Sequence, residues 1–539
     1  MDRRSFIVSA GGAALAGLGS AAGFQRWQEI TPAVRDPGRA EGHLLRDRAA
    51  LPPPSSVIET EVAILGSGIA GLSAGWQLDR LGRRDYLLFD GPEAFGNAAG
   101  SAYGEYACPT GAHYLPLPGV EAGHVRAMLA DLGIIQAGAF DEAPRYDERF
   151  VLHGPEERLY HRGQWQDGLM PAEDQAEEQR FLAHMDRLRH GRGADGRRSF
   201  VFPSVLSSGD PAFDGLDALS FAAWLDREGY RAPALRWYLD YCCRDDYGAG
   251  IAGVSAWAGV HYFAGRWGRA ANADDNGLLT WPGGLAPLAD ALAARAGERR
   301  RAGTAVSVRA RGDRAEALCF TLDNGKPRSV LVKARRIVCA MPLFVAARVV
   351  EGIEALGFDP RRHMPAYAPW MVTNFVMRDF PREREGAPLA WDNVVYGGKG
   401  LGYVVSTHQD IRAGAPDKTV FTAYTALADR TPLEARRWLQ RATPEELMAL
   451  ASSDLRQAYG WAFAACVERA DITLRAHAMA IPRPGFRGNA GLAALREAEG
   501  PVLFAHSDLS GFSVFEEAAW WGCQAARRVG LAATPPTRR

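Results

Sequence analysis

The sequence predicts an α/β fold, in which the chain builds one domain of parallel strands and helices, leaves it twice and re-enters it twice. Two observations lead to this prediction. An apolar strand, the turn GSGIAG and an apolar helical pattern follow one another over Val62–Leu78, and turn-to-helix patterns return near residues 283 and 508. The two intervening stretches mix helical and strand-like segments, which predicts an inserted α+β substrate domain. The chain has 539 residues, of which 47% are apolar, enough for more than one core.

The turn in the first unit has the glycine spacing that a bound dinucleotide requires. The residues expected to line the phosphates are Gly66, Ser67, Gly68, Ile69, Ala70 and Gly71. Gly66 permits the sharp turn out of the strand, Gly68 lets the backbone approach a pyrophosphate, and Gly71 lets the helix lie close to the sheet. Asp90 ends the next strand, 24 positions after Gly66, where an acid accepts the ribose hydroxyls. The sequence therefore predicts a Rossmann-like FAD/NAD(P)-binding domain, and this motif alone leaves FAD and NAD open.

Composition divides the chain into seven segments. They are a leader at 1–24, a Pro- and Gly-rich linker at 25–56, three parts of the nucleotide-binding domain at 57–119, 276–345 and 491–535, and two parts of the substrate domain at 120–275 and 346–490. The first part of the substrate domain is rich in helical patterns and aromatic residues, which favours a helical cap over a pocket.

The N-terminus has the pattern of a twin-arginine export signal. Arg3-Arg4 precedes Phe6 and a Gly/Ala-rich apolar run, which ends in small residues near Ala22. This pathway carries folded proteins, so a cofactor can be inserted before export. We therefore expect a periplasmic or exported protein that meets the twin-arginine translocase. A cytoplasmic protein with a chance arginine pair is the alternative, and cleavage or retention of the leader stays open.

The remaining composition excludes several functions. The net charge is -1 and no long basic block occurs, so nucleic-acid binding has no support. No stretch after the leader is long and apolar enough to predict a stable membrane span. The seven cysteines form no CxxC pattern, so we expect no metal site.

Four parts of the chain, in the same order, resemble one known family. They are GSGIAG with Asp90, the loop through Gly111, Ala112 and His113, the strand containing Val306, and LFAHSDLSG with Asp508, Ser510 and Gly511. This set is similar to the FAD-dependent amine oxidase and protoporphyrinogen oxidase superfamily, including its desaturase relatives. The resemblance implies non-covalent FAD in an extended pose, with the backbone of Val306 at the adenine and Asp508 near the ribityl chain. The C-terminal part favours FAD over NAD.

Some positions depart from that family. Its amine oxidases usually carry a lysine near flavin N5, where this sequence has Thr373. They also carry two aromatic rings that face the flavin, where this sequence offers Val514 and Phe486. These departures weaken the prediction of a monoamine oxidase more than that of an FAD oxidoreductase.

The resemblance implies hydride transfer from a substrate C–H bond to flavin N5, because the flavin performs the difficult chemistry. An amine is the expected substrate, with a polyamine as one candidate. The catalytic candidates are His477, His408 and Tyr403, and further pocket candidates are His261, Tyr262 and Trp391. His506, beside Asp508, is a candidate cofactor contact.

Two other functions stay open on the sequence. One is a desaturase or dehydrogenase that acts on a C–C bond, which needs an apolar tunnel without an ion-pairing acid. The other is a flavin-bound protein without turnover. The electron acceptor is also left open, because proximity to a flavin does not decide reactivity with oxygen.

Overall fold

The computed structural model describes residues 27–46, 51–171, 173, 175–275, 277–383, 386–411, 413–414 and 416–531. The predicted export signal lies outside these residues. Within the described ranges, no helix has the length and apolar character needed to cross a bilayer. The same ranges contain no group of three or more His, Cys, Asp or Glu side chains placed to hold a metal ion.

The nucleotide-binding domain is built on a seven-stranded sheet. Its order is β12 (Arg300–Arg301), β3 (Tyr86–Phe89), β2 (Ser56–Leu65), β15 (Lys326–Cys339), β14 (Arg314–Asp323) and β13 (Thr304–Arg311), with β21 (Val502–Phe504) paired to β15. β12, β3, β2, β15 and β21 run parallel, and β13 to β15 form an antiparallel meander. The predicted α/β fold class is confirmed.

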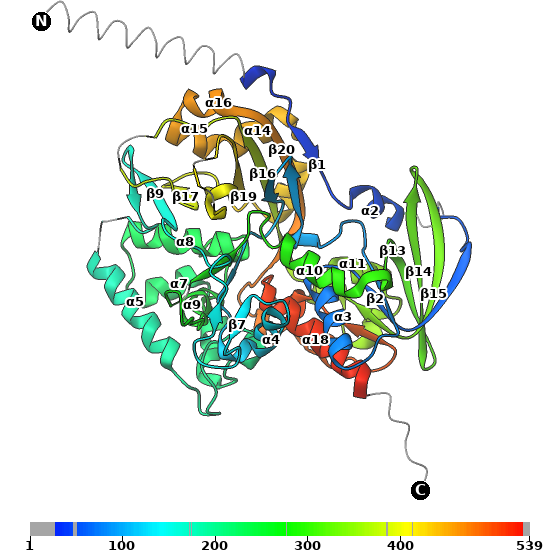
Figure 1. Cartoon of the computed structure of the whole chain (residues 1–539). Helices are drawn as coiled ribbons and strands as arrows, with labels where there is room; N and C mark the ends of the chain where they lie inside the picture. Colours follow the sequence, from blue (N-terminus) through cyan, green and yellow to red (C-terminus); the bar gives the residue numbers. More distant parts are fainter. Residues whose placement is uncertain are drawn as a thin grey trace, which may run out of the picture.

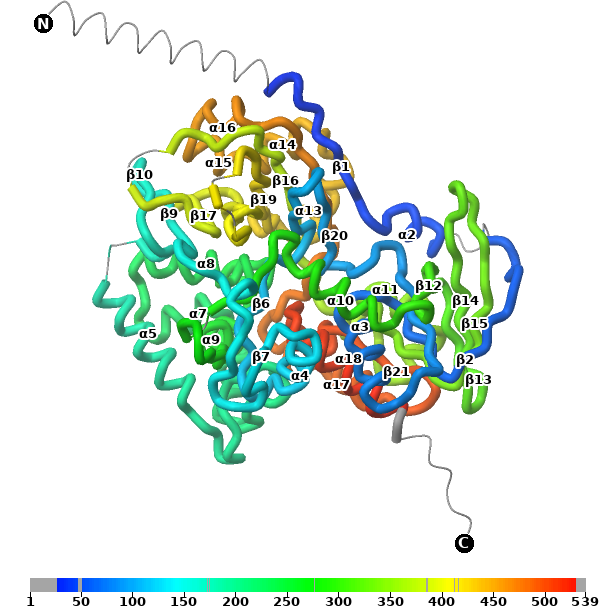
Figure 2. The backbone as a smooth tube through the Cα atoms, in the orientation of Figure 1, coloured from blue at the N-terminus to red at the C-terminus, as the bar shows by residue number. Residues whose placement is uncertain are grey.

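The start, middle and end of the chain meet in this sheet. Cys339 pairs with Leu65 on one side and with Phe504 on the other. Helices α3 (Ile69–Arg80) and α18 (Phe515–Leu531) cover the sheet side by side, as Figure 2 shows. The other helices around this domain are α4 (Gly123–Asp131), α10 (Ala286–Ala296), α11 (Leu343–Val349), α12 (Pro360–His363) and α17 (Ala490–Glu497). Three distant sequence segments therefore share one core.

The second domain is an eight-stranded sheet between two layers of helices (Figure 1). Its strands in order are β1 (Ala33–Arg35), β20 (Val467–Ile481), β16 (Ala366–Met377), β19 (Thr419–Ala426), β18 (Tyr403–Val405), β17 (Asp392–Val395), β9 (Glu157–His161) and β10 (Gln164–Asp167). One face packs on α13 (Pro432–Leu439), α14 (Pro444–Ala451), α15 (Ser453–Tyr459) and α16 (Trp461–Cys466). The other face meets α8 (Pro233–Tyr247). Helices α5 (Gln175–His190), α6 (Asp214–Asp217), α7 (Phe221–Arg227) and α9 (Ala256–Ala264) lie beside α8.

Three short ribbons connect these parts. They pair β4 (Gly100–Tyr103) with β5 (Tyr106–Pro109), β6 (Tyr114–Pro116) with β11 (Leu278–Thr280), and β7 (Ile135–Ala137) with β8 (Arg145–Tyr146). The domain boundary expected at residue 120 falls inside a core, because α4 and Tyr146 pack with α3 and α18.

The segment expected to be an extended linker is ordered where it is described. β1 pairs parallel with β20, and Trp27 and Ile30 pack on the core behind the eight-stranded sheet. Helix α2 (Arg39–Arg46) follows, and its Leu45 packs on the nucleotide-binding core. The segment therefore runs across both domains (Figure 1). The composition predicted a free tether because this segment has few apolar residues, and these find their packing partners only in the tertiary fold.

Candidate functional site

The glycine turn has the geometry of a phosphate loop. Gly66 has φ +115°, and a Cβ there would lie 2.7 Å from the carbonyl oxygen of Ala340. A Cβ on Gly71 would lie 1.8 Å from the carbonyl oxygen of Gly66. A Cβ on Gly68 would meet no atom within 4 Å. A side chain would therefore clash with the backbone at the first and third glycines, whereas the space beside the second is free. A pyrophosphate needs this access to the backbone.

The predicted adenosine end is formed by Asp90 and the start of β13. The backbone N–H of Asp90 donates to Arg301 O at 3.0 Å, and Ser67 Oγ donates to Asp90 O at 3.1 Å. Arg300 Nε donates to Asp90 Oδ1 at 2.6 Å, a contact that sequence reasoning missed. A bulge in the pairing of β13 with β14 leaves Val306 without a partner in the register, which frees backbone groups at the expected adenine position.

Asp508 is fully buried in the C-terminal turn and is held by protein groups. Its Oδ2 accepts from Tyr367 Oη at 2.6 Å and from the Leu343 N–H at 2.9 Å, and His506 Nδ1 lies 3.2 Å from its Oδ1. Burial opposes its charge, but His506 and these hydrogen bonds outweigh burial and lower the pKa of Asp508. Ser510 Oγ donates to Glu517, and Gly511 has φ +75°.

The loop predicted to lie beside the flavin is fixed between the domains. Tyr424 Oη donates to Gly111 O at 3.0 Å, and the Ala112 N–H donates to Asn97 O at 2.7 Å. Ala112 is exposed although its neighbour Gly111 is buried. This loop therefore presents a small, accessible side chain where a flat ring system would need space.

Aromatic rings surround the loop on its substrate-domain side. The His113 ring stacks on Tyr424 with centroids 4.5 Å apart and lies 5.3 Å from Trp391. Tyr114 meets Trp391 edge-on at 6.1 Å. Burial lowers the pKa of His113 to about 3, so this imidazole is neutral at physiological pH. It contributes a ring and no positive charge.

Helix α8 brings carboxylates to these rings. Trp237, Tyr241 and Asp245 are spaced i, i+4 and i+8, so they lie on one face. Tyr114 Oη lies 3.4 Å from Asp245 Oδ2 and 3.5 Å from Asp246 Oδ1, and it can donate to either. Burial raises the pKa of Asp245 to about 7, and the neighbouring Asp246 adds to this effect.

Two more acids face α8 from the sheet. Asp392 of β17 and Glu157 of β9 are paired in register, so both side chains lie on the same face. Tyr241 Oη donates to Asp392 Oδ2 at 3.5 Å. Burial, followed by the charges of Asp245 and Glu157, raises the pKa of Asp392. We call this set the acid–aromatic site: His113, Tyr114, Glu157, Trp237, Tyr241, Asp245, Trp391, Asp392 and Tyr424.

The acid–aromatic site is short of positive charge. Among the described residues, none forms an ion pair with Asp245, Asp392 or Glu157. Asp246 alone is paired, with Arg266 Nη2 at 2.8 Å from its Oδ2. Sequence reasoning missed these acids. For the acids on α8, the helical spacing in WYLDYCCRDDY was an available signal, but no local sequence pattern indicated Asp392.

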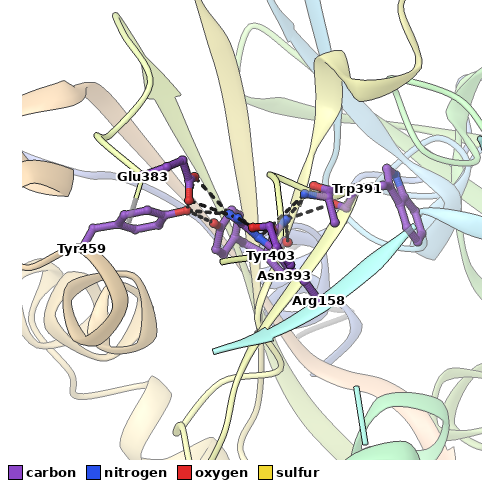
Figure 3. A network of polar contacts seen from close by, with 8 residues as sticks. Arg158, Glu383, Trp391, Asn393, Tyr403 and Tyr459 are labelled. Atoms are coloured by element: carbon purple, nitrogen blue, oxygen red, sulfur yellow. Dashed lines mark hydrogen bonds and ion pairs between the residues drawn. The ribbon is translucent and has the colours of Figure 1, made fainter. Parts of the chain in front are cut away.

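Tyr403, a predicted catalytic residue, faces the opposite side of the sheet. Its hydroxyl lies 2.6 Å from Tyr459 Oη, and its ring stacks on Phe421 in the core behind the sheet. Figure 3 shows it in a polar network with Arg158, Glu383 and Tyr459. The prediction was wrong because successive side chains on a strand alternate between faces, and register was unknown from sequence.

The same network supports the site from behind. Arg158 is fully buried, and its guanidinium donates to Asn393 Oδ1 at 2.6 Å and to both oxygens of Glu383 at 3.0 Å. Asn393 Nδ2 in turn donates to Ala390 O at 2.8 Å and to Trp391 O at 3.3 Å (Figure 3). The network therefore fixes the backbone that carries Trp391 into the acid–aromatic site.

Thr373 also faces away from the site. It shares the face of Met371 and Phe375 in the core behind the sheet, whereas Trp370 and Val372 face the acid–aromatic side. Thr373, expected at the family's lysine position beside the flavin, therefore points away from the acid–aromatic site.

The predicted histidines lie apart from the acids. His408 Nε2 contacts His153 O at 3.1 Å. His477 stacks on Phe344 at 4.4 Å and meets Tyr367, the partner of Asp508. Burial lowers the pKa of His477 to about 4. No described contact joins either histidine to Asp245.

Further predicted positions pack in the helical layer. His261 is buried and contacts Val201 O, and Phe486 packs with Trp257 and Phe512. Tyr262 and Val514 border the same cluster, and Tyr262 also packs against the core that contains Tyr241, Trp391 and Tyr424.

Comparisons with known proteins agree with this geometry. Residues 64–132 match the family described as NAD(P)-binding Rossmann-like domain. The chain is thus an α/β protein with a dinucleotide-binding domain of that type. A search of curated proteins finds no match.

Several solved structures share the overall fold. Putrescine oxidase with bound putrescine superimposes with a TM-score of 0.62 at 16% identity, covering 89% of this chain and 100% of that one. Cyclohexylamine oxidase from Brevibacterium oxydans IH-35A gives 0.61 at 18% identity, covering 88% and 99%. A fatty acid isomerase from P. acnes gives 0.57 at 15% identity, covering 87% and 98%. At these identities the likeness establishes the fold.

Proposed function

We propose that this protein is an FAD-dependent oxidoreductase that oxidises an amine. Three features support FAD: the open backbone at Gly68, the bulge at Val306, and the convergence of the first, middle and last segments on one sheet. The residues that would hold it are those of the glycine turn, Asp90, the Gly111–His113 loop and the turn after β21. When bound, the flavin supplies a hydride acceptor.

The observation that carries the choice of substrate is that three acids of the acid–aromatic site form no ion pair with any described residue. Buried carboxylates are costly unless a cation or hydrogen bonds balance them. Asp245, Asp392 and Glu157 have no cationic partner among the described side chains. A substrate ammonium group would supply that charge, and the rings of Trp391 and Tyr424 would add cation–π attraction.

This arrangement disfavours the reaction at a C–C bond. An apolar substrate would leave Asp245 and Asp392 without a cationic partner, and the alternative hypothesis requires an apolar tunnel without such acids. The resemblance in fold to a fatty acid isomerase supports a reaction at a C–C bond as the second candidate function.

The side chains have separate tasks in amine oxidation. Asp245 binds the ammonium group and takes one of its protons, because hydride loss from the neighbouring carbon needs the neutral nitrogen lone pair. The aromatic rings orient the carbon chain and exclude water. Neutral His113 avoids the electrostatic repulsion that an imidazolium would exert on the substrate.

The second acid pair supports a diamine or polyamine. Asp392 and Glu157 lie next to each other on neighbouring strands, and Glu157 is exposed at the outer end of β9. Like charges at paired positions repel unless a cation lies between them. We infer that they receive the distal ammonium group of a substrate whose proximal group lies at Asp245.

Export by the twin-arginine pathway remains part of the proposal and rests on Arg3-Arg4. Fractionation of the native host should recover the flavoprotein from the periplasm. Recovery from the cytoplasm in a strain with a working translocase would contradict it.

An anaerobic substrate panel tests the function. Butylamine, 1,4-diaminobutane and an unsaturated fatty acid are mixed separately with the yellow protein, and flavin absorbance is followed. We expect the diamine to bleach the flavin fastest and an aldehyde to appear. Asp392→Asn should raise KM for the diamine about tenfold or more and leave butylamine unchanged, since a hydrogen bond to a charged group contributes about 1.5–3 kcal/mol. Bleaching by the fatty acid alone would favour the second candidate.

A further inference from the structure

The substrate domain holds the predicted flavin loop by three consecutive backbone carbonyls, those of residues 109–111. Asn374 Nδ2 donates to the first at 3.1 Å, Arg475 Nε to the second at 2.9 Å and Tyr424 Oη to the third at 3.0 Å. We call these three side chains the carbonyl clasp. Because the loop and its donors belong to different domains, the clasp sets where the loop lies relative to the substrate sheet.

The three donors come from neighbouring strands and share one face of the sheet. Arg475 is on β20, Asn374 on β16 and Tyr424 on β19, and these strands lie side by side in that order. In the register, Asn374 pairs with Thr422, and Arg475 pairs with Trp370. Side chains alternate along each strand, so all of these residues face the side that carries the acid–aromatic site.

Two clasp members are oriented by a further contact. Thr422 Oγ1 donates to Asn374 Oδ1 at 2.7 Å, which turns the NH2 group of Asn374 toward the loop. The ring of Tyr424 stacks on His113, with centroids 4.5 Å apart. Asn374 and Tyr424 are only 1% and 5% exposed, so water does not compete for these hydrogen bonds.

Arg475 also joins the flavin loop to the loop that follows Asp90. Its Nη1 donates to Glu93 Oε2 at 2.7 Å and its Nη2 to Glu93 Oε1 at 3.2 Å, which is a bidentate ion pair. The Arg475 side chain is 8% exposed and that of Glu93 is 23% exposed. Asn97, in the same loop as Glu93, donates from Nδ2 to Ala478 O of β20. One strand of the substrate domain is therefore bonded to both loops.

The next two carbonyls of the flavin loop are held by the nucleotide-binding domain itself. The Leu285 N–H donates to Ala112 O at 3.1 Å, and Thr280 Oγ1 donates to His113 O at 2.8 Å. Every carbonyl from residue 109 to residue 113 thus has a donor. The exposed side chain of Ala112 therefore has a defined position between the two domains.

We propose that the carbonyl clasp positions the flavin loop, with Arg475 fixing it relative to the loop after Asp90, so that the substrate domain determines where the flavin ring lies. This inference rests on the FAD part of the proposed function and not on the choice of substrate. Asn374 and Arg475 are positioning residues, because they act through the loop. Hydride transfer is sensitive to such positioning, since a displacement of about 1 Å can lower a rate about a hundredfold.

Tyr424→Phe removes one hydrogen bond of the clasp and keeps the ring. FAD is titrated into the flavin-free full chain, and the visible absorbance of the FAD-saturated protein is recorded. We expect a Kd for FAD roughly five- to tenfold higher than that of the wild type, because a buried carbonyl loses its donor. We also expect the flavin absorbance band to shift, because the ring lies in changed surroundings. Tyr403→Phe is the matched control: it removes a buried hydroxyl on the neighbouring strand β18 that faces the core behind the sheet, and both readouts should match the wild type.

Arg475→Gln tests the clasp member that touches both loops. It removes the ion pair with Glu93, and it should raise the Kd for FAD about tenfold or more and also shift the flavin band. In the double variant with Tyr424→Phe, the combined effect on the Kd should be smaller than the product of the two single effects, because both substitutions release the same loop. Arg469→Gln, which changes an ion pair to Asp471 within β20, is the control and should keep the wild-type Kd.

These readouts need no substrate, so they decide the clasp separately from amine oxidation. A purely structural role would lower the Tm of the flavin-free variants and leave the spectrum of the FAD-saturated proteins unchanged. An unchanged Kd or an unchanged spectrum in Tyr424→Phe would overturn the proposal, and if that variant does not fold, Arg475→Gln decides it by the same two readouts. If amines reduce the wild type, Tyr424→Phe should lower the limiting rate of flavin reduction more than it raises KM, because the ring that faces the substrate is retained. If no amine reduces the wild type, the proposed substrate class fails and the result on the clasp stands.

Discussion

Replacing Asp245 by Asn should stabilise the protein at alkaline pH while it weakens binding of amines. Burial raises the pKa of Asp245 to about 7 from an ordinary value of 3.8. Because the folded pKa is the higher one, the folding free energy that depends on this group is complete below about pH 4 and is lost as the pH rises to about 7. At 1.36 kcal/mol for each pKa unit, the loss at pH 8 is on the order of 4 kcal/mol. Asparagine has nearly the same shape as aspartate but does not ionise, so the variant does not lose this folding free energy as the pH rises.

Thermal unfolding and cation titration measure the two effects. The Tm of Asp245→Asn relative to the wild type should rise between pH 5 and pH 8. Tetramethylammonium, a cation without a transferable proton, should bind the variant roughly ten- to a hundredfold more weakly, because an interaction with a charged group contributes about 1.5–3 kcal/mol. A lower Tm for the variant at pH 8 would contradict this prediction, since it would mean that Asp245 is already ionised and stabilised in the resting protein.

Three further substitutions check the cofactor loop and the sheet faces. Gly68→Ala should keep the Tm of the flavin-free wild type but purify with little flavin, because its Cβ meets no protein atom within 4 Å and lies where the pyrophosphate is expected. Gly42→Ala, equally unobstructed in α2, should stay yellow. Tyr403→Phe should leave kcat/KM for amines within about twofold, because its hydroxyl faces the core behind the sheet. A loss above tenfold would show that Tyr403 takes part in the reaction after all. Arg158→Met should lower the free energy of unfolding by about 3 kcal/mol or more and lower the Tm, because it leaves Glu383 without its buried partner. An unchanged Tm would show that solvent satisfies Glu383 in place of Arg158.

The sequence was sufficient for the nucleotide-binding domain because the rules involved are local. Gly66, Gly68 and Gly71 are dictated by backbone sterics within one turn, and Asp90 follows from the length of one βαβ unit. The order of the three segments also followed from sequence, and the pairing of Leu65, Cys339 and Phe504 brings them together.

The proposed substrate site depends on tertiary structure. Asp245 and Asp392 are 147 positions apart, and they meet only because α8 crosses the face of the sheet that carries β17. Tyr403 and Thr373 lie on the face behind the sheet, which the sequence did not reveal because a shift of one residue in register turns every side chain of a strand over. Local patterns fix the turn that holds phosphates, whereas the charge balance of a buried site depends on which distant side chains the fold brings together, and no single segment carries that information.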